Sequence, residues 1–426
     1  MMSVTTVQPV PEDQAKKNIQ RRKSKNIRLQ IYGLSAIGTA VLLLGILFSS
    51  LLYTGASAFT QTHLTFDVKI DPNLVKEDDI FGSNFRGIVR SGLYSLFPEV
   101  TNPRDQRQLG DIPSNGAQFT LRDRVVEDPS LIGQTVSITV PVSDAFDQFY
   151  KGVIPRDVPE EQRKVSDKQI VWWDQLVDNG QVSKPFNWTL LFSADSRFPE
   201  LAGLSGAIVG SFYALLVCFL ISFPVGIAAA VYLEEFAPKN RWTDLIEVNI
   251  NNLAAVPSVV FGLLGLAVFL QFFGLPRSAP LVGGMVLSLM TLPTIIITTR
   301  AALKAVPPSI REGGFGIGAS HQQVVMHHVL PLAMPGILTG TIIGLAQALG
   351  ETAPLLLIGM NAFITSAPGG IMDSATALPT QIFIWADSPE RGFVARTSAA
   401  ILVLIGFLVV MNLIAVVLRQ RFQRKW

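Results

Sequence analysis

The chain has 426 residues, of which 49% are hydrophobic and only 15% are charged, against about 25% charged residues in an ordinary soluble domain. The formal net charge of +2 hides an uneven distribution, because the charges gather in a few segments and leave long windows with none. This composition excludes a disordered chain and a nucleic-acid-binding protein, and it predicts an integral membrane protein embedded in lipid.

Six windows of the sequence are long and apolar enough to cross a membrane. A helix needs about 20 apolar residues for this, and backbone amides inside lipid must be satisfied within the segment, which predicts helices rather than strands. The predicted spans are residues 31–59, 201–233, 253–274, 279–299, 332–359 and 397–418, the fifth of which is interrupted only by Glu351.

Basic residues flank the first and last spans. Residues 1–30 form a basic tail, and the C-terminus ends in Arg419, Arg421, Arg424 and Lys425. Lys and Arg concentrate in cytoplasmic flanks, so both termini are predicted to be cytoplasmic, and with six spans the loop 300–331 is cytoplasmic too.

Residues 56–58, Ala-Ser-Ala, imitate a signal-peptide cleavage site, but the apolar stretch before them exceeds the roughly 7 to 15 residues of a signal peptide core. This length favours an uncleaved first helix.

The segment between the first two spans, residues 60–200, predicts a soluble domain outside the membrane. It carries 15 Lys/Arg against 21 Asp/Glu. Apolar residues recur at helical spacing over 85–96, residues 136–140 alternate like a strand, and Ser166 and Gly180 bracket another helix. We therefore expect a small α+β domain. Trp172 and Trp173 could form a ligand platform, but core packing or a seat at the membrane interface is the more common use of such a pair.

Hydroxyl side chains form a stripe in the fourth span. Ser288, Thr291, Thr294 and Thr298 lie within an arc of about 120° on a helix of 3.6 residues per turn, and Arg300 closes the inner end. Hydroxyl donors that lead to a guanidinium could pass an oxyanion, so these five residues are candidates for lining a translocation path. Serine and threonine also pack helices in membranes and bond their own backbone, and this alternative stays open.

The loop at 300–331 reads RAALKAVPPSIREGGFGIGASHQQVVMHHVLP and predicts two short helices outside the membrane. Pro307 and Pro308 begin the first helix, Gly318 permits the turn, and the second runs from Ser320 until Pro331 forbids its continuation. Such a pair suits docking into a groove on another protein. A mere connector need not be this long or this structured.

Small residues and one carboxylate share a face of the fifth span. Gly336, Gly340 and Gly344 recur every four residues, followed on the same face by Ala348 and Glu351. Small residues at this spacing let helices approach closely. A carboxylate in a span costs about 2.5 to 3.5 kcal/mol on insertion scales and usually faces the bundle interior or an aqueous cavity. Glu351 is therefore predicted to point inward, as a structural partner of a neighbouring helix or as part of the substrate path.

Catalytic and metal motifs are missing from the sequence. There is no G-x-x-x-x-G-K-[ST] motif, so the chain cannot bind ATP through a P-loop and its energy must come from a partner. Cys218 is the single cysteine, and His321, His327 and His328 share one polar segment without carboxylate partners. We expect no catalytic residue, no metal site and no cofactor.

The loop 300–331 resembles the EAA loop of ABC importer permeases, whose pattern is E-A-A, three residues, G, nine residues and I-x-L-P. The matching residues are Glu312, Gly313, Gly314, Gly318, Leu330 and Pro331, with the glycine pair in place of two alanines and His328 at an apolar position. Each glycine would loosen the first helix by about 1 kcal/mol relative to alanine. In the family this loop seats in the ATP-binding subunit and transmits its motion, which the resemblance implies for Glu312 and Gly318.

Other segments are similar to phosphate-specific permeases of the A type. They are YLEEFA at 232–237, NINNLAAVPS at 249–258 and LGETAPLL at 349–356. The resemblance covers roughly residues 201–426 and implies an all-α, type I importer bundle of six transmembrane helices in a bacterial cytoplasmic membrane. The five-helix permease domain is then 201–426, and the α+β domain at 60–200 is inserted on the periplasmic side.

The resemblance also implies partners. They are a second, homologous permease subunit, cytoplasmic ATP-binding subunits and a periplasmic phosphate-binding protein. Alternatives remain at this stage: a permease for another oxyanion such as molybdate or sulfate, and a membrane-anchored sensor or scaffold. The short cytoplasmic loops argue against a sensor, which needs a catalytic or phospho-accepting domain inside the cell.

Overall fold

The computed structural model describes residues 12–75 and 80–422, and the chain divides into two compact units, Met1–Tyr53 and Thr54–Trp426. Residues 1–11 of the predicted basic tail, together with Arg424 and Lys425, lie outside the described residues. The first unit holds most of α1 (Glu12–Ala56), a single helix of 45 residues. The basic residues that follow Glu12 are therefore part of the same helix as the first span, and not of a separate tail.

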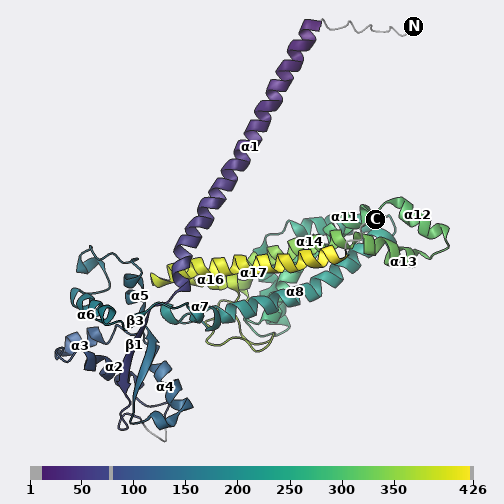
Figure 1. The fold of residues 1–426 in the computed structure, drawn as a ribbon. Helices are drawn as coiled ribbons and strands as arrows, with labels where there is room; N and C mark the ends of the chain where they lie inside the picture. The colour runs from purple at the N-terminus through teal and green to yellow at the C-terminus, as the bar shows by residue number, and fades with distance from the viewer. Residues whose placement is uncertain (1–11, 76–79, 423–426) are drawn as a thin grey trace, which may run out of the picture. The chain divides into compact units, whose positions relative to one another are not determined.

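The second unit begins with the predicted α+β domain (Figure 1). Its sheet has the strand order β2-β1-β3, and β1 pairs antiparallel with both neighbours, with Phe66 opposite Ile138. The elements are η1 (Ser57–Phe59), β1 (His63–Lys69), α2 (Phe85–Leu96), α3 (Pro103–Leu109), α4 (Ala117–Glu127), η2 (Pro129–Leu131), β2 (Thr135–Pro141), α5 (Asp144–Tyr150), η3 (Glu160–Gln162), α6 (Asp167–Asp178), β3 (Val182–Ser183), α7 (Trp188–Phe192) and η4 (Pro199–Leu201).

The sequence patterns in this domain are confirmed. The helical repeat over 85–96 is α2, the alternation over 136–140 lies in β2, and α6 begins at a capping box of Ser166 and Gln169. Buried apolar side chains of β1, β2 and the helices form one core. Trp173 is fully buried in this core and Trp172 is 8% exposed. The tryptophan pair therefore packs the core and is no ligand platform.

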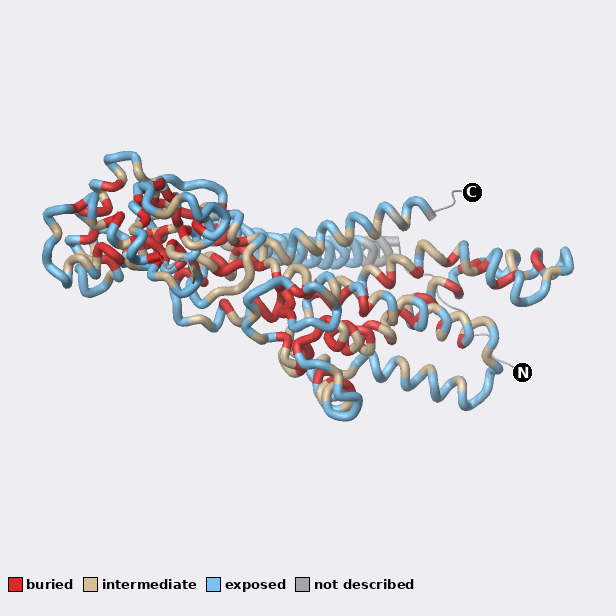
Figure 2. The backbone as a smooth tube through the Cα atoms, turned by 90° about the horizontal axis from the view of Figure 1, so that it is seen from below, coloured by how far each residue is buried: buried red, intermediate tan, exposed pale blue. Residues whose placement is uncertain are grey.

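Helices make up the rest of the second unit, and buried residues run along their facing sides (Figure 2). The elements are α8 (Ser205–Val231), η5 (Tyr232–Phe236), α9 (Arg241–Ala254), α10 (Ser258–Leu264), η6 (Gly265–Phe272), α11 (Pro280–Lys304), α12 (Pro308–Gly316), α13 (His321–Val324), η7 (Val325–Val329), α14 (Leu330–Gly350), α15 (Ala353–Leu357), α16 (Leu378–Ala386) and α17 (Gly392–Phe422). Of these, η5, η6 and η7 are π-helical.

Contacts between helices fix their directions. A Cβ on Gly284 of α11 would touch Val217 of α8, and a Cβ on Gly226 of α8 would touch Ile295 of α11, so these two helices run parallel. Gly336 of α14 faces Ala302 of α11, and Gly340 faces Thr298, so α14 runs antiparallel to both. Because α8 begins at the α+β domain, the end of α11 that leads into α12 lies at the opposite end of the bundle.

The bounds of the spans in the structure differ from the predicted ones, most informatively in the third and the fifth span. Among the described residues, five helices are long and apolar enough to cross a membrane, and a sixth span is present if α9 and α10 with η6 count as one span, bent by 102°. The third span is thus broken before Pro257 and extends back to Arg241, outside the predicted 253–274. The fifth is helical from His321 and ends at Gly350, whereas the prediction was 332–359.

Candidate functional site

The loop after α11 folds into two short helices, as its sequence predicts. Gly318 lies between them with a φ of +85°, a left-handed conformation that only glycine adopts at no steric cost. The second helix begins at a capping box in which the Ser320 hydroxyl accepts from the Gln323 backbone N–H and the Gln323 side chain accepts from that of Ser320. We call Pro308–Gly316, the turn at Gly318 and His321–Val324 the coupling hairpin.

The prediction that Pro331 ends the second helix is wrong. The chain stays helical from His321 to Gly350 through the π-helical turn η7. The Leu330 N–H donates to the Val325 carbonyl, five residues back. Proline normally clashes with the carbonyl four residues before it, and the wider π-helical turn just before Pro331 shifts that register. The hairpin is therefore continuous with α14, so a displacement of the hairpin can pass directly into a membrane helix.

The glycine pair in the hairpin has two different environments. A Cβ on Gly314 would lie 2.8 Å from the Val324 side chain, whereas a Cβ on Gly313 would meet nothing within 4 Å. Gly314 is buried and Gly313 is exposed. The close approach of α12 and α13 therefore depends on Gly314, and the second alanine of the family pattern would not fit here without a shift.

The two glycines give a matched pair of substitutions. We expect Gly314→Ile to separate α12 from α13 and to lower the melting temperature, because overpacking of a closed contact costs about 1 to 3 kcal/mol. Gly313→Ile adds the same atoms on the open face and should leave the melting temperature nearly unchanged. Thermal unfolding of both variants in detergent measures this, and equal shifts for the two variants would contradict it.

An ion pair fixes the hairpin to the bundle. Arg311 of α12 donates from Nη2 to Glu235 Oε1 at 2.6 Å, and Glu235 lies on the π-helical segment η5 that ends α8. The side chain of Glu235 is only 6% exposed and that of Arg311 is 23% exposed. The same guanidinium donates to the carbonyls of Leu303 at 3.0 Å and Val306 at 2.8 Å. Arg311 thus binds one carbonyl in the last turn of α11 and one just beyond it, while it joins α12 to η5.

A second ion pair network lies beside the first and involves Arg300. Arg300 Nε lies 3.2 Å from Glu234 Oε2, and its Nη2 lies 2.5 Å from Glu247 Oε1 of α9. Lys304 Nζ lies 3.5 Å from the same Glu234 oxygen. Two carboxylates thus pair with Arg300, which ties η5, α9 and α11 together. This pairing favours a structural role, and a place for Arg300 in the translocation path stays a prediction.

His321 makes the third contact between hairpin and bundle. Its Nε2 lies 2.8 Å from the Glu235 carbonyl oxygen. Its ring packs at the edge of Phe236, with centroids 4.9 Å apart, and stacks on Phe315 at 5.8 Å. The residues of η5 therefore bind both helices of the hairpin.

The hydroxyl stripe of the fourth span faces the glycines of the fifth. A Cβ on Gly340 would collide with the Thr298 side chain, and one on Gly344 would touch Thr291 and Thr294. Ser288, Thr291 and Thr298 donate their hydroxyls to carbonyls of their own helix at 2.6, 3.1 and 2.8 Å. This geometry favours the packing role for the stripe over a role in lining a path, and it confirms that the glycines let α11 and α14 approach closely.

Glu351 lies at a helix break and not within a helix. α14 ends at Gly350, the Glu351 backbone is extended with a ψ of 122°, and α15 begins two residues later. Gly350 and Pro354 are the stop signals for this break. The Glu351 side chain is half-buried, and within the described residues it has neither a hydrogen bond nor an ion pair. Its carboxylate is thus free for another partner, unlike that of Glu234 or Glu235.

The outer surface of the hairpin is exposed and partly apolar. Ile317 is 81% exposed, Met326 is 50% exposed and Phe315 is 46% exposed. Glu312 is exposed on the same hairpin, and Leu330 is half-buried where the hairpin joins α14. Exposed apolar side chains around a rigid turn fit a groove on a partner protein.

The sequence patterns missed Glu234, Glu235, Glu247 and Arg311 as site residues. Two adjacent carboxylates directly after an apolar window, with several basic residues in the loop 300–331, were the available signal. The pairing itself joins residues 66 and 76 positions apart, so only the tertiary structure gives the partners.

Comparisons with known proteins identify the family of this chain. A family model described as binding-protein-dependent transport system inner membrane component matches residues 222–425, and a domain of unknown function (DUF3333) matches residues 16–160. The probable ABC transporter permease protein YqgI of Bacillus subtilis is 30% identical over 54% of this chain and 82% of that protein. The chain belongs to the ABC transporter permease family.

The chain is also similar to a second permease sequence and to a solved transporter structure. The phosphate transport system permease protein PstA 2 of Mycobacterium bovis is 32% identical over 57% of this chain and 79% of that protein. The solved MetNI methionine ABC transporter, in an inward-facing conformation, aligns with 18% identity and a TM-score of 0.39, over 51% of this chain and 94% of that chain. As an ABC importer permease, the chain is a multi-pass membrane protein and a translocation component, and ATP hydrolysis and substrate binding belong to partner subunits.

Proposed function

We propose that this permease imports inorganic phosphate and receives its energy through the coupling hairpin. The observation that carries the proposal is the hairpin itself: two short helices, fixed to the bundle by Arg311–Glu235 and continuous with α14, present an exposed apolar turn. The likeness to the PstA 2 permease supports phosphate as the substrate. A permease for another oxyanion, molybdate or sulfate, is the second candidate.

The proposal includes three partners, which the exposed hairpin and the membership of the importer permease family support. The exposed hairpin, with Glu312 and Ile317, docks into a groove on a cytoplasmic ATP-binding subunit. A second, homologous permease completes the translocation path, because the described residues provide at most five spans besides that of α1. A periplasmic phosphate-binding protein delivers the substrate to the outer face.

An uptake assay tests the substrate. In a strain that lacks its own phosphate importers, the complete transporter should restore uptake of radiolabelled phosphate, and a tenfold excess of molybdate or sulfate should not compete. Co-purification with tagged candidate ATPases identifies the energy-coupling partner in the same strain. Restored uptake of molybdate or sulfate, without uptake of phosphate, would assign the second candidate instead.

The membrane orientation is also part of the proposal. The α+β domain at 60–200 lies outside, and both termini and the loop 300–331 lie in the cytoplasm of a bacterial inner membrane. A cysteine introduced at Gln322 should react with an impermeant thiol reagent only after spheroplasts are opened, whereas one at Val153 should react in intact spheroplasts. Cys218 is buried and does not interfere. Equal labelling at both sites in intact spheroplasts would refute this orientation.

Glu351 is proposed as part of the translocation path. Its half-buried carboxylate lies at the break between α14 and α15, and discontinuous helices form the substrate sites of many transporters. We expect Glu351→Gln to assemble normally and to reduce uptake roughly tenfold, because the substitution keeps the shape and removes the charge. Uptake kinetics over several phosphate concentrations measure the effect. Unchanged kinetics would leave Glu351 with a structural role only.

A further inference from the structure

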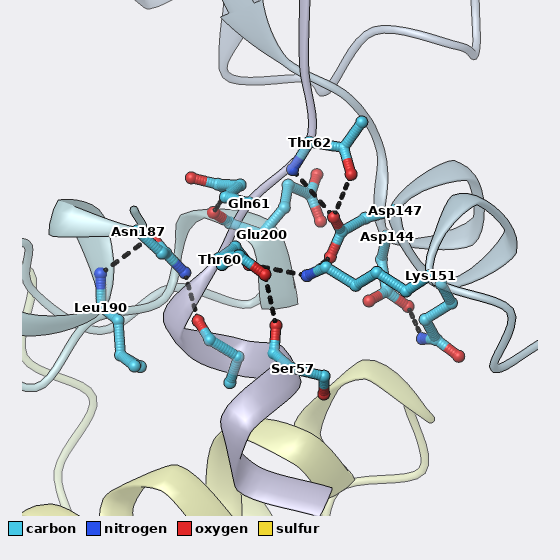
Figure 3. A network of polar contacts seen from close by, with 12 residues as sticks. Ser57, Thr60, Gln61, Thr62, Asp144, Asp147, Lys151, Asn187, Leu190 and Glu200 are labelled. Carbon is cyan, nitrogen blue, oxygen red and sulfur yellow. Dashed lines mark hydrogen bonds and ion pairs between the residues drawn. The ribbon is translucent and has the colours of Figure 1, made fainter. Parts of the chain in front are cut away.

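The α+β domain joins the outer end of the bundle through a buried polar junction (Figure 3). Asp147 of α5 lies at its centre. Its Oδ1 accepts hydrogen bonds from the backbone N–H of Thr62 at 2.9 Å and from the Thr62 hydroxyl at 2.7 Å. Its Oδ2 lies 2.5 Å from Lys151 Nζ, which also donates to the Thr60 carbonyl at 2.7 Å. The segment that leaves α1 is thus bound to α5 by side chains.

Glu200 binds the segment that enters α8 to the same junction. Glu200 is only 4% exposed. Its Oε1 accepts a hydrogen bond from the Ser114 hydroxyl at 2.7 Å, and its backbone carbonyl accepts one from Gln61 Nε2. Asn187 adds a link from α7 to the Ala58 carbonyl at 2.9 Å. The entrance and exit of the domain are therefore fixed side by side.

Arg396 brings the last span into this junction. It lies near the start of α17, is 6% exposed, and donates from Nη1 to the Ala202 carbonyl at 2.5 Å. Its charge interacts with Asp147, Glu200 and Asp144, all residues of the 60–200 domain. A Cβ on Gly392, one turn earlier, would collide with the Asp144 carboxylate. The counter-charges of a buried arginine on a membrane helix therefore come from the outer domain.

The charges of the junction are unequal. Asp144, Asp147 and Glu200 supply three carboxylates, and Lys151 and Arg396 supply two cations. Burial raises the pKa of Asp144 and of Glu200, and burial lowers the pKa of Lys151. Loss of the charge of Asp144 or Glu200 is thus tolerated, whereas loss of Arg396 would leave the three carboxylates with only one of the two cations, which is strongly destabilising.

A second, exposed ion pair joins the same two parts and serves as a control. Lys164 Nζ lies 2.8 Å from Glu390 Oε2, and their side chains are 56% and 48% exposed. Exposed pairs contribute little because solvent screens them. If electrostatic interactions hold these two parts together, the buried charges around Arg396 and its hydrogen bond to the Ala202 carbonyl must do so.

We propose that Arg396, Asp147 and Glu200 clamp the α+β domain to the outer end of α17, so that the domain moves with α17 as one body and does not swing as a separate receptor. The domain is then a rigid extension of a membrane helix. This inference goes beyond the proposed function and does not depend on the transported substrate.

Distances between two spin labels test the clamp. We would place labels at Gln175 of α6 and Val409 of α17, which are both exposed, in the assembled transporter in detergent. The single native cysteine is buried, so it does not take up label. We expect one narrow distance distribution in the otherwise unchanged protein and in Lys164→Ala, and a distribution at least twice as broad in Arg396→Gln.

Two results would overturn the clamp: a broad distribution when Arg396 is intact, or a distribution in Arg396→Gln as narrow as that of the control. If Arg396→Gln does not accumulate, Asp147→Asn replaces it. Removal of that carboxylate charge takes away the ion-pair partner of Lys151 and the first of the charges that act on Arg396, so the distribution should broaden. An unchanged distribution in Asp147→Asn would then refute the proposal.

The raised pKa of Asp144 gives a pH-dependent expectation. Because this pKa is higher in the folded protein than its ordinary value of 3.8, the folded state binds the proton more tightly, and ionisation of Asp144 lowers stability as the pH rises through the folded pKa. Asp144→Asn should therefore melt at a higher temperature than the unchanged protein at pH 8, and the difference should shrink toward pH 4. Melting curves at several pH values measure it, and a less stable Asp144→Asn at pH 8 would contradict it.

Discussion

Replacement of Arg311 by leucine is expected to uncouple the hairpin from the bundle and to reduce uptake at least a hundredfold. Arg311 is the residue that joins α12 to Glu235 of η5 and to the carbonyls that end α11. Glu235 is almost fully buried, so removal of its partner leaves an uncompensated charge, which costs about 3 to 5 kcal/mol. Because about 1.4 kcal/mol changes an equilibrium constant tenfold, this loss of stabilisation displaces the hairpin from the bundle in most molecules.

Uptake and ATPase activity of the reconstituted transporter measure this effect. Lys304→Leu is the matched control, because Lys304 is 59% exposed and its contact with Glu234 is 3.5 Å long, so its loss should change uptake less than about threefold. Glu235→Gln should reproduce the Arg311→Leu defect, and the double variant should be no worse than either single variant. Independent, additive losses would show that the two side chains do not act as a pair.

Reversal of charge at Glu312, or a side chain at Gly318, is expected to prevent docking of the hairpin while the chain still inserts normally. Glu312 is exposed and has no role in the bundle contacts. Gly318 has a φ of +85°, and a Cβ added there would meet nothing within 4 Å. The left-handed backbone conformation therefore costs Gly318→Val about 1 to 2 kcal/mol, and no steric clash adds to this cost. Both changes therefore alter the surface of the hairpin and leave its core intact.

Binding to the ATP-binding subunit separates this expectation from misfolding. Glu312→Arg and Gly318→Val should both accumulate to normal levels and still pair with the second permease, but they should pull down the ATP-binding subunit roughly tenfold less, with uptake reduced in parallel. Gly406→Val is the control, because Gly406 lies on α17 and a Cβ added there would meet nothing within 4 Å. Normal pull-down and full uptake in both variants would make the hairpin a connector.

The experiments on Arg311 and Glu312 also distinguish two properties of one element. Arg311 fixes the hairpin to η5, and Glu312 is part of the surface that the hairpin exposes to the ATP-binding subunit. If Arg311→Leu binds the ATP-binding subunit normally but loses uptake, transmission through η5 has been interrupted. If Glu312→Arg loses binding, the contact surface has been altered.

The sequence by itself determined the membrane class, the spans and the hairpin. Long uncharged windows are hydrophobic enough to cross a bilayer whatever their neighbours are, and proline and glycine fix local backbone geometry through their own covalent structure. For these reasons the helices of the hairpin, the turn at Gly318 and the elements over 85–96 and 136–140 could be predicted from short segments alone.

Only the tertiary structure decided which polar residues are free and which are paired. Arg300 pairs with Glu234 and Glu247, and the carboxylates that act on Arg396 belong to a domain about 200 to 250 positions away in the chain. The hydroxyl stripe faces glycines of α14, and the π-helical turn before Pro331 lets the helix continue. A buried charge needs an opposite charge nearby to offset the free-energy cost of its burial. The packing of segments that are distant in the sequence determines which residue provides that charge. A local sequence pattern therefore does not encode the partner.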